Sequence, residues 1–205
     1  MSKRTAPKVA WDQAKSEVIK MKLEAILTEA AMLFTQKGYS ATSLDDVSGQ
    51  LQITKTALYH YVKNKNELLY LCYLRSLERT EDCYKAADAE GKTGLEKVIS
   101  YLRHDAKSGL IAMTPLTELN AIVDQTRKKD LAKRLDKCEK KFISFIKQGI
   151  ADGSISAGDP EEISHFILSA SRDILKWYDP HSDDPISELV ERFITLFTQG
   201  LIPRK

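Results

Sequence analysis

Apolar residues recur at helical spacing along most of this 205-residue chain, and almost no segment alternates as a half-buried β-strand does. Between Leu23 and Phe34, for example, the apolar positions form one stripe along a helix. Glycine and proline, which interrupt helices, number only nine and six, and they stand where such stripes end. The sequence therefore predicts an all-α fold of about nine helices without internal repeats.

Charge is distributed unevenly along the chain, although the net charge is only +2. Residues 1–75 carry 11 basic and 7 acidic side chains, a net charge of +4, and the remaining 130 carry 20 and 22, a net charge of −2. Hydrophobic residues make up 42% of the chain, which is enough for a folded core. The excess of positive charge predicts that an anionic partner binds the N-terminal part.

Cysteine, histidine and hydrophobic patterns exclude several classes of protein. The three cysteines are an odd number, and neither CxxC nor HxxxH occurs, so we expect no disulfide framework and no metal site. No apolar run approaches the ~20 residues that span a bilayer, and the basic N-terminus lacks the apolar segment of a signal peptide. These features predict a cytoplasmic protein with no membrane partner.

Motifs of common enzyme classes do not occur in the sequence. GxGxxG, GxxxxGK, GxSxG and HExxH are all missing. Paired carboxylates such as Glu161-Glu162 stand at expected helix starts, where capping and the helix dipole explain them. We therefore expect a protein that is not an enzyme, with no catalytic residues and no cofactor.

The N-terminal third has the pattern of a helix-turn-helix. A long helix should end at Gly38, and a short helix should follow it, capped by Thr42 or Ser43 with an aspartate three residues later. A third helix, also short, should begin after Thr54 and end near residue 61. Two short helices that follow a longer one in this way are typical of a helix-turn-helix.

The third of these helices has a surface suited to nucleic acid. No acidic residue occurs from Gln50 to Asn66, whereas three lysines do. Four side chains of the helix should project outward: Lys55, Thr56, Tyr59 and His60. Ammonium, hydroxyl and imidazole groups without a carboxylate suit phosphate oxygens and major-groove base edges. An ordinary solvated surface explains the three lysines equally well.

Residues 23–69 resemble the DNA-binding domain of TetR-type transcriptional repressors. The resemblance rests on many residue types at fixed spacing: Ala30-Ala31, Phe34, Gly38-Tyr39, Thr42-Ser43, Asp46-Val47, Ile53-Thr54-Lys55, Leu58-Tyr59, Tyr61, Lys63-Asn64-Lys65 and Glu67-Leu68. Three positions depart from the family pattern: Gln52 replaces the turn glycine, Val62 a phenylalanine and Ser48 an alanine. The resemblance implies a three-helix DNA-binding domain followed by a helical domain that binds a ligand and dimerises.

The resemblance also implies which residues contact DNA: Thr42, Ser43, Thr54, Lys55, Thr56, Tyr59, His60, Tyr61 and Lys65. Thr42 or Ser43 should touch a phosphate at a helix N-terminus, and Lys65 should hold another phosphate. Residues 54–56 should contact bases or adjacent phosphates. The two tyrosine hydroxyls should reach the DNA backbone, with core packing as the alternative role of Tyr61.

The expected domains are a basic N-terminal arm (1–16), the helix-turn-helix DNA-binding domain (17–68) and the ligand-binding and dimerisation domain (69–205). The arm either reaches a neighbouring groove or is a mobile tail. The last two helices carry wide apolar faces, which fits a homodimer. Such a dimer would bind a near-palindromic operator with half-sites about 34–36 Å apart, and a small-molecule inducer would release it.

The C-terminal residues around Trp177-Tyr178-Asp179-Pro180 resemble a subgroup that controls fatty-acid and steroid degradation and responds to acyl-CoA thioesters. Candidate ligand-binding residues are cationic or apolar: Arg75, Tyr101, Arg103, His104, Met113, Phe166, Arg172 and Trp177. Two alternatives stay open. One is a regulator of efflux or stress genes that responds to a hydrophobic drug-like ligand, and the other is a helical protein-binding scaffold without DNA binding.

Overall fold

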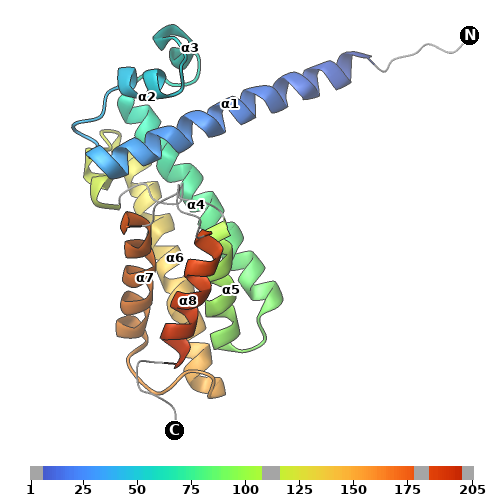
Figure 1. Ribbon diagram of the computed structural model, residues 1–205, viewed down its shortest axis with the longest axis vertical. Helices are drawn as coiled ribbons and strands as arrows, with labels where there is room; N and C mark the ends of the chain where they lie inside the picture. The colour runs from blue at the N-terminus through green and yellow to red at the C-terminus, as the bar shows by residue number, and fades with distance from the viewer. Residues whose placement is uncertain (1–6, 108–115, 178–184, 200–205) are drawn as a thin grey trace, which may run out of the picture. The chain divides into compact units, whose positions relative to one another are not determined.

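The structure is a computed structural model that describes residues 7–107, 116–177 and 185–199. Over these ranges all regular secondary structure is helical, which confirms the all-α prediction (Figure 1). The elements are eight α-helices and one 3-10 helix: α1 (Pro7–Lys37), α2 (Leu44–Gln50), α3 (Lys55–Tyr59), α4 (Lys65–Glu90), α5 (Gly94–Lys107), η2 (Leu116–Ala121), α6 (Gln125–Asp152), α7 (Pro160–Trp177) and α8 (Ile186–Gln199). None of the helices in these ranges has the length and apolar character needed to cross a membrane.

Helix α1 is longer than the sequence analysis expected. The basic arm was expected over residues 1–16, but the helix already begins at Pro7. Proline is well tolerated at the first helical position, where its missing N–H costs no hydrogen bond, and Ala10 and Ala14 favour a helix. Most of the expected arm is therefore helical, and residues 1–6 lie outside the described part.

The chain forms two compact units. Unit 1 comprises residues 1–72 together with 114–123, and unit 2 comprises 73–113 and 124–205. The boundary falls inside α4, after residue 72 instead of the expected residue 68. Residues 114–123 were expected in the second domain but group with the first. We call them the return segment, and its described part includes η2.

The core of unit 1 is built on the apolar stripe of α1. The stripe is almost fully buried, which confirms its prediction, and its most buried members are Ile26, Ala30, Ala31 and Phe34. Buried leucine and valine side chains of the next three helices complete the core: Leu44, Val47, Leu58, Leu68 and Leu69. Helix α1 packs on α2, and α2 packs on α3. This packing positions the outward side chains of the two short helices.

The turn between α2 and α3 contains a residue with an unusual backbone conformation. Gln52 has a φ of 53°, in the left-handed region that glycine adopts without strain. Its N–H donates to Gly49 O at 3.1 Å, and the N–H of Ile53 donates to Ser48 O at 3.0 Å. The turn therefore has a conformation suited to glycine, although the residue is glutamine.

Replacing Gln52 by glycine is expected to raise the free energy of unfolding by about 0.5–1 kcal/mol, because the left-handed strain is removed. The larger entropy of glycine in the unfolded chain offsets part of the gain. Chemical denaturation followed by circular dichroism measures the change. Gln50→Gly is the matched control, because it places glycine at the end of α2 and should destabilise. An equal loss of stability in both variants would contradict the prediction.

Unit 2 is a helical bundle with an aromatic interior. Helix α5 packs on α6 and α8, and α6 packs on α7; Figure 1 shows these helices side by side. Tyr84 of α4 stacks on Tyr101 of α5 with ring centroids 4.5 Å apart. Phe145 meets the Tyr84 ring edge-on, and Phe142 meets the Tyr101 ring in the same way. All four rings are buried, so they form the centre of this unit.

Helices α5 and α6 approach each other closely at a glycine. Gly94, the first residue of α5, is buried against the backbone of Gly149 in α6. The Asp152 carboxylate accepts a hydrogen bond from Gly94 N–H at 2.8 Å, and the Ser154 hydroxyl accepts one from Leu95 N–H at 3.1 Å. The end of α6 thus satisfies the first N–H groups of α5, which have no partner within their own helix.

Candidate nucleic-acid interface

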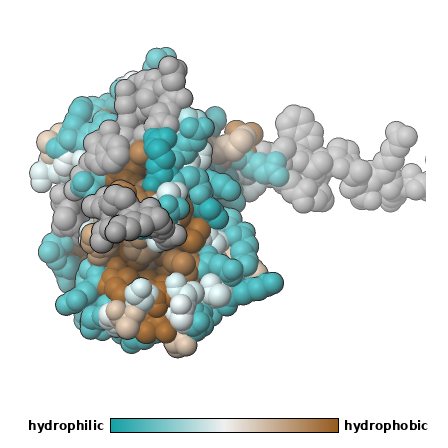
Figure 2. Space-filling view, turned by 60° about the horizontal axis from the view of Figure 1, so that its bottom comes forward, coloured by the Kyte–Doolittle hydropathy of each residue, from teal (hydrophilic) through white to brown (hydrophobic). Residues whose placement is uncertain are grey.

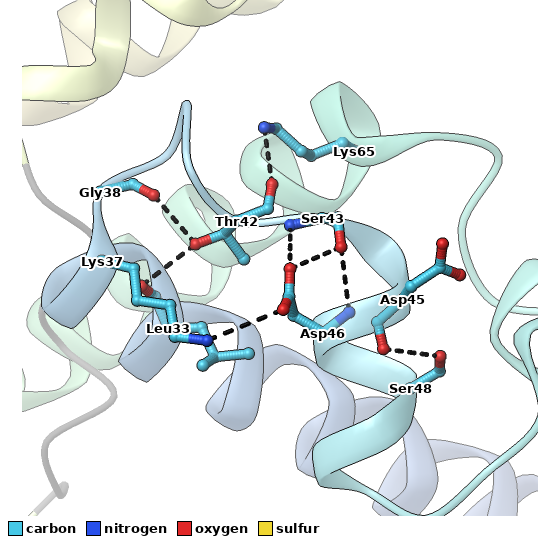
Figure 3. Close-up of polar contacts among 9 residues, drawn as sticks. All are labelled: Leu33, Lys37, Gly38, Thr42, Ser43, Asp45, Asp46, Ser48 and Lys65. Carbon is cyan, nitrogen blue, oxygen red and sulfur yellow. Dashed lines mark hydrogen bonds and ion pairs between the residues drawn. The ribbon is translucent and has the colours of Figure 1, made fainter.

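Helix α2 begins in a capping box (Figure 3). The Ser43 hydroxyl accepts a hydrogen bond from Asp46 N–H at 3.1 Å, and Ser43 N–H donates to the Asp46 carboxylate at 2.7 Å. The Ser43 hydroxyl, the Ser43 N–H and then the Lys37 ammonium hold the pKa of Asp46 below its ordinary value. Of the two boxes that the sequence allows, the structure therefore shows the one that starts at Ser43.

Thr42 and Ser43 have different surroundings, although both are predicted DNA contacts. The Thr42 hydroxyl donates to Gly38 O at 2.9 Å and Leu33 O at 3.2 Å (Figure 3). Thr42 is only 1% exposed, whereas Ser43 is exposed. The Thr42 hydroxyl thus fastens the end of α1 to the start of α2, whereas Ser43 is the more accessible of the two, and a phosphate contact by either residue stays a prediction.

Lys65, predicted to hold a phosphate, binds carbonyl oxygens of its own chain. Its ammonium donates to Tyr39 O at 2.6 Å, Thr42 O at 2.7 Å and Ser40 O at 3.3 Å. It also lies 4.3 Å from the centroid of the Tyr39 ring. Three acceptors match the three N–H groups of an ammonium. Lys65 therefore fastens the start of α4 to the α1–α2 connection, and Figure 3 shows its bond to Thr42.

Helix α3 presents most of the predicted contact residues to solvent. Thr54 caps the helix by accepting a hydrogen bond from Ala57 N–H at 3.1 Å. The exposed side chains are the four predicted from the sequence: Lys55, Thr56, Tyr59 and His60. Tyr61, which follows the helix, is half-buried, so both roles considered for it stay open.

A carboxylate lies beside α3, although the sequence from Gln50 to Asn66 contains none. Asp45 of α2 places Oδ1 2.8 Å and Oδ2 2.9 Å from the Nζ atom of Lys55. The hydrogen bond to Asp45, and then its charge, hold the pKa of the Lys55 ammonium above its ordinary value. The expectation of an acid-free surface is corrected, because two residues ten positions apart meet across the turn.

Sequence analysis missed Asn66, which holds the return segment within unit 1. Its side-chain amide donates to Ala121 O at 2.5 Å, and its Oδ1 accepts a hydrogen bond from Val123 N–H at 3.3 Å. No local signal in the sequence could reveal this role, because the partners lie more than fifty residues later. The first residues of α4, Lys65 and Asn66, thus fix two different segments of unit 1.

Three of the four predicted ligand-binding residues with basic side chains contact carboxylates within unit 2. The pairs are Arg103 with Glu191 at 2.6 and 2.8 Å, His104 with Glu90 at 2.9 Å, and Arg75 with Glu78 at 3.3 Å. Each of these three side chains contacts a different carboxylate, and their role in ligand binding stays a prediction. The fourth, Arg172, is exposed on α7 and acts electrostatically on Asp105 of α5.

The residues predicted to line an apolar ligand site are also divided. Tyr101 lies in the aromatic interior, but Phe166 is 67% exposed on α7. Its neighbour Ile167 is fully buried on the same helix, and the role of Phe166 in ligand binding stays a prediction. The side chains of Met113 and Trp177 lie outside the described part. Figure 2 shows hydrophobic residues gathered into a patch on the face drawn there.

Asp105 of unit 2 acts electrostatically on two buried tyrosines, Tyr84 and Tyr101. Nothing in the sequence indicated this environment. Burial raises the pKa of Asp105 to about 6, and the positive charge of Arg172 offsets part of this effect. The Asp105 charge in turn contributes to the raised pKa values of the Tyr84 and Tyr101 hydroxyls, for which burial is the main cause. An acid with a shifted pKa in such surroundings is a candidate for recognising a polar group of a ligand.

Replacing Asp105 by asparagine is expected to raise the free energy of unfolding at pH 7.5 by about 1–2 kcal/mol. The folded carboxyl has a pKa of about 6 and the unfolded one about 3.9, so the folded state binds the proton more tightly. The contribution of Asp105 to stability therefore falls as the pH rises from 4 to 6, and the variant should lose this contribution. Asp136→Asn, at an exposed residue, is the control. A variant less stable than the native protein at pH 7.5 would contradict the prediction.

The capped α2, the fixed turn and the exposed polar side chains of α3 define a helix-turn-helix DNA-binding protein. The family described as "Bacterial regulatory proteins, tetR family" matches residues 26–70, and "Tetracyclin repressor-like, C-terminal domain" matches residues 95–201. The chain belongs to the tetR family of transcriptional regulators. Both matches agree with the resemblance noted in the sequence.

Known proteins resemble this chain over most of its length. The Transposon Tn10 TetC protein of Escherichia coli is 27% identical over 74% of this chain and 77% of its own length. The HTH-type transcriptional repressor KstR2 of Rhodococcus jostii is 22% identical over 86% of this chain and 89% of its own. A crystal structure of AibR in complex with isovaleryl coenzyme A and operator DNA has a TM-score of 0.66 at 21% identity, covering 86% of this chain and 98% of AibR. The AibR likeness shows a shared fold.

Proposed function

We propose that this protein is a repressor that binds a near-palindromic operator as a homodimer and leaves it when a small-molecule inducer binds. The observation that supports this most is the exposed polar surface of α3, which α2 holds in a helix-turn-helix. Membership of the tetR family supports a role in transcription, and the repressor-like C-terminal match favours repression over activation.

In the proposed complex, α3 enters the major groove of the operator. Lys55 and Thr56, at its start, contact base edges or adjacent phosphates, and the exposed Tyr59 hydroxyl reaches the DNA backbone. The exposed Ser43 at the start of α2 contacts a phosphate. Lys65 supports these contacts indirectly, because it fixes the connection that precedes Ser43.

Helices α7 and α8 form the proposed dimer interface. Phe166 of α7 is 67% exposed and Leu196 of α8 is 53% exposed, and α7 packs on α8. Large exposed apolar side chains on two adjoining helices favour a protein interface there. Two copies joined in this way would present two α3 helices to half-sites about 34–36 Å apart. The operator should accordingly be an inverted repeat.

A binding assay with the DNA upstream of the protein's own gene tests the function. We expect the purified dimer to shift this fragment in a gel at concentrations that leave a scrambled duplex of equal length free. Footprinting should protect an inverted repeat within the fragment. Equal affinity for both duplexes would contradict operator recognition and favour the alternative of a protein-binding helical scaffold.

The inducer that we favour is an acyl-CoA thioester. The resemblance around Trp177 supports this choice, as does the AibR complex, which holds isovaleryl coenzyme A together with operator DNA. A panel of acyl-CoA thioesters of different chain length should contain a member that raises the melting temperature and releases the operator fragment, whereas free coenzyme A should not. A response only to hydrophobic drug-like compounds would favour a regulator of efflux or stress genes instead.

A further inference from the structure

We propose that Asp45 is a specificity-determining residue, whose carboxylate orients the Lys55 ammonium toward a base and withholds its charge from unrelated DNA. This inference rests on the proposed function, because it concerns how α3 distinguishes an operator from other sequences. The juxtaposition that carries it is the contact of both Asp45 oxygens with Lys55 Nζ, at 2.8 and 2.9 Å.

The Asp45 carboxylate takes no part in the capping hydrogen bonds of its own helix, although its charge in the first turn also suits the helix dipole. The capping box of α2 uses Ser43 and the next residue, Asp46. Figure 3 shows the Asp45 carboxylate turned away from that network of hydrogen bonds. Asp45 therefore has a different task from Asp46, and Lys55 is the partner that the structure gives it.

The ion pair also contributes little to the folded state. The side chains of Asp45 and Lys55 are 65% and 50% exposed, and ion pairs at such exposure add little to stability because water competes for both charges. A carboxylate at this place carries a cost as well, since it repels the phosphates that α3 must approach. Asp45 thus stabilises the fold little and opposes binding to DNA of any sequence. Both properties fit a residue that helps to distinguish the operator from unrelated DNA.

The geometry suggests how the pair discriminates. An ammonium has three N–H groups, of which one donates to Asp45 Oδ2 while Oδ1 lies 2.8 Å from Nζ, so that even a second bond to Asp45 leaves one N–H over. The third can donate to a base acceptor such as guanine O6 or N7, which lysine reads in the major groove. On unrelated DNA that places no acceptor there, the pair stays neutral and releases no counterion. Lys55 thus adds affinity only where the base fits.

Asp45→Asn tests the proposal in the full-length dimer. Affinities for the upstream fragment and for a scrambled duplex are measured at four salt concentrations. We expect the variant to bind the scrambled duplex at least fivefold more tightly and the ratio of the two affinities to fall at least fivefold. The slope of log K against log salt for the scrambled duplex should steepen by about 0.9 per subunit, the value for one phosphate contact.

Lys55→Gln and the double variant show whether Asp45 acts through Lys55. In the Lys55→Gln background, the added Asp45→Asn change should alter the affinity ratio by less than twofold. An Asp45→Asn effect of full size in that background, or a single variant whose ratio stays within twofold of the native one, would overturn the proposal. Asp136→Asn removes another exposed carboxylate, which lies in unit 2, and should leave the ratio unchanged.

The experiment also distinguishes a failure of the proposed function, and a failure of the variant to fold, from a failure of the role proposed for Asp45. If the native protein does not distinguish the upstream fragment from the scrambled duplex, the proposed function fails before Asp45 is considered. Thermal unfolding followed by circular dichroism shows whether Asp45→Asn folds, and Asp45→Glu serves as a second variant that retains the charge. Because the longer side chain displaces the ammonium, Asp45→Glu should lower the affinity for the upstream fragment without tightening binding to the scrambled duplex. Tighter scrambled binding by Asp45→Glu would contradict the charge-withholding role.

Discussion

Replacing Lys65 by methionine is expected to weaken binding to the upstream fragment at least tenfold and to lower the free energy of unfolding by about 2 kcal/mol. The reason is that one ammonium donates to three carbonyl oxygens of the α1–α2 connection. Charge-assisted hydrogen bonds contribute about 1.5–3 kcal/mol each, and water replaces part of this at a half-buried site. Without the ammonium, the connection that carries Ser43 loses its fixed position.

The salt dependence of the same variant distinguishes two roles for Lys65. A lysine that holds a phosphate, as the sequence predicts, would flatten the slope of log K against log salt by about 0.9 per subunit when it is removed. A lysine that holds carbonyl oxygens should leave this slope within a few tenths of its native value, and this is the result we expect. Lys63→Met removes the same charge from an exposed site two residues earlier and should leave stability unchanged.

Replacing Gly94 by alanine is expected to lower the free energy of unfolding by about 3 kcal/mol or more, the largest loss of stability that we predict. A Cβ atom at this position would overlap the backbone N and Cα atoms of Gly149 and the carbonyl oxygen of Phe145. These are backbone atoms of α6, so no rotation of a side chain relieves the overlap. The start of α5 must move away and lose its hydrogen bonds to Asp152 and Ser154.

Gly158→Ala is the matched control for this change in unit 2. Its Cβ atom would stand 3.1 Å from Cδ1 of Ile163, the far end of a flexible side chain, so the change in stability should stay within about 0.5 kcal/mol. Urea denaturation followed by circular dichroism compares the two variants. Equal stability of the Gly94 and Gly158 variants would contradict the close approach of α5 and α6.

Features that depend on neighbouring residues could be predicted from the sequence. The apolar stripe of α1, a capping box at Thr42 or Ser43 and the cap at Thr54 are all local patterns. The structure confirms the stripe and the Thr54 cap, and it shows the box at Ser43. The helical start at Pro7 was missed because basic residues near a chain end suggested an arm. The left-handed backbone of Gln52 was missed because its side chain gives no sign of it.

Contacts between distant segments could not be predicted in this way. Lys65 meets carbonyl oxygens 23 to 26 residues earlier, and Asn66 meets atoms 55 and 57 residues later. The carbonyl oxygens that bind Lys65 are backbone atoms, and every residue has such an atom. No residue type in the sequence therefore marks them as partners of Lys65, and its charge suggested a phosphate instead. The contact of Asp45 with Lys55 could not be predicted for a related reason: Asp45 precedes the acid-free stretch, and only the fold brings it to Lys55.

The return segment has a consequence for how regulators of this kind can be recombined. The chain leaves unit 1 after residue 72, re-enters it at residue 114 and leaves it again after residue 123, so three peptide links join the units. A chimera made by one crossover at residue 72 would pair Asn66 with a foreign segment in place of Ala121 and Val123. A chimera that takes unit 1 from this protein must therefore include residues 114–123 as well as 1–72. Two separate stretches of the gene encode this unit.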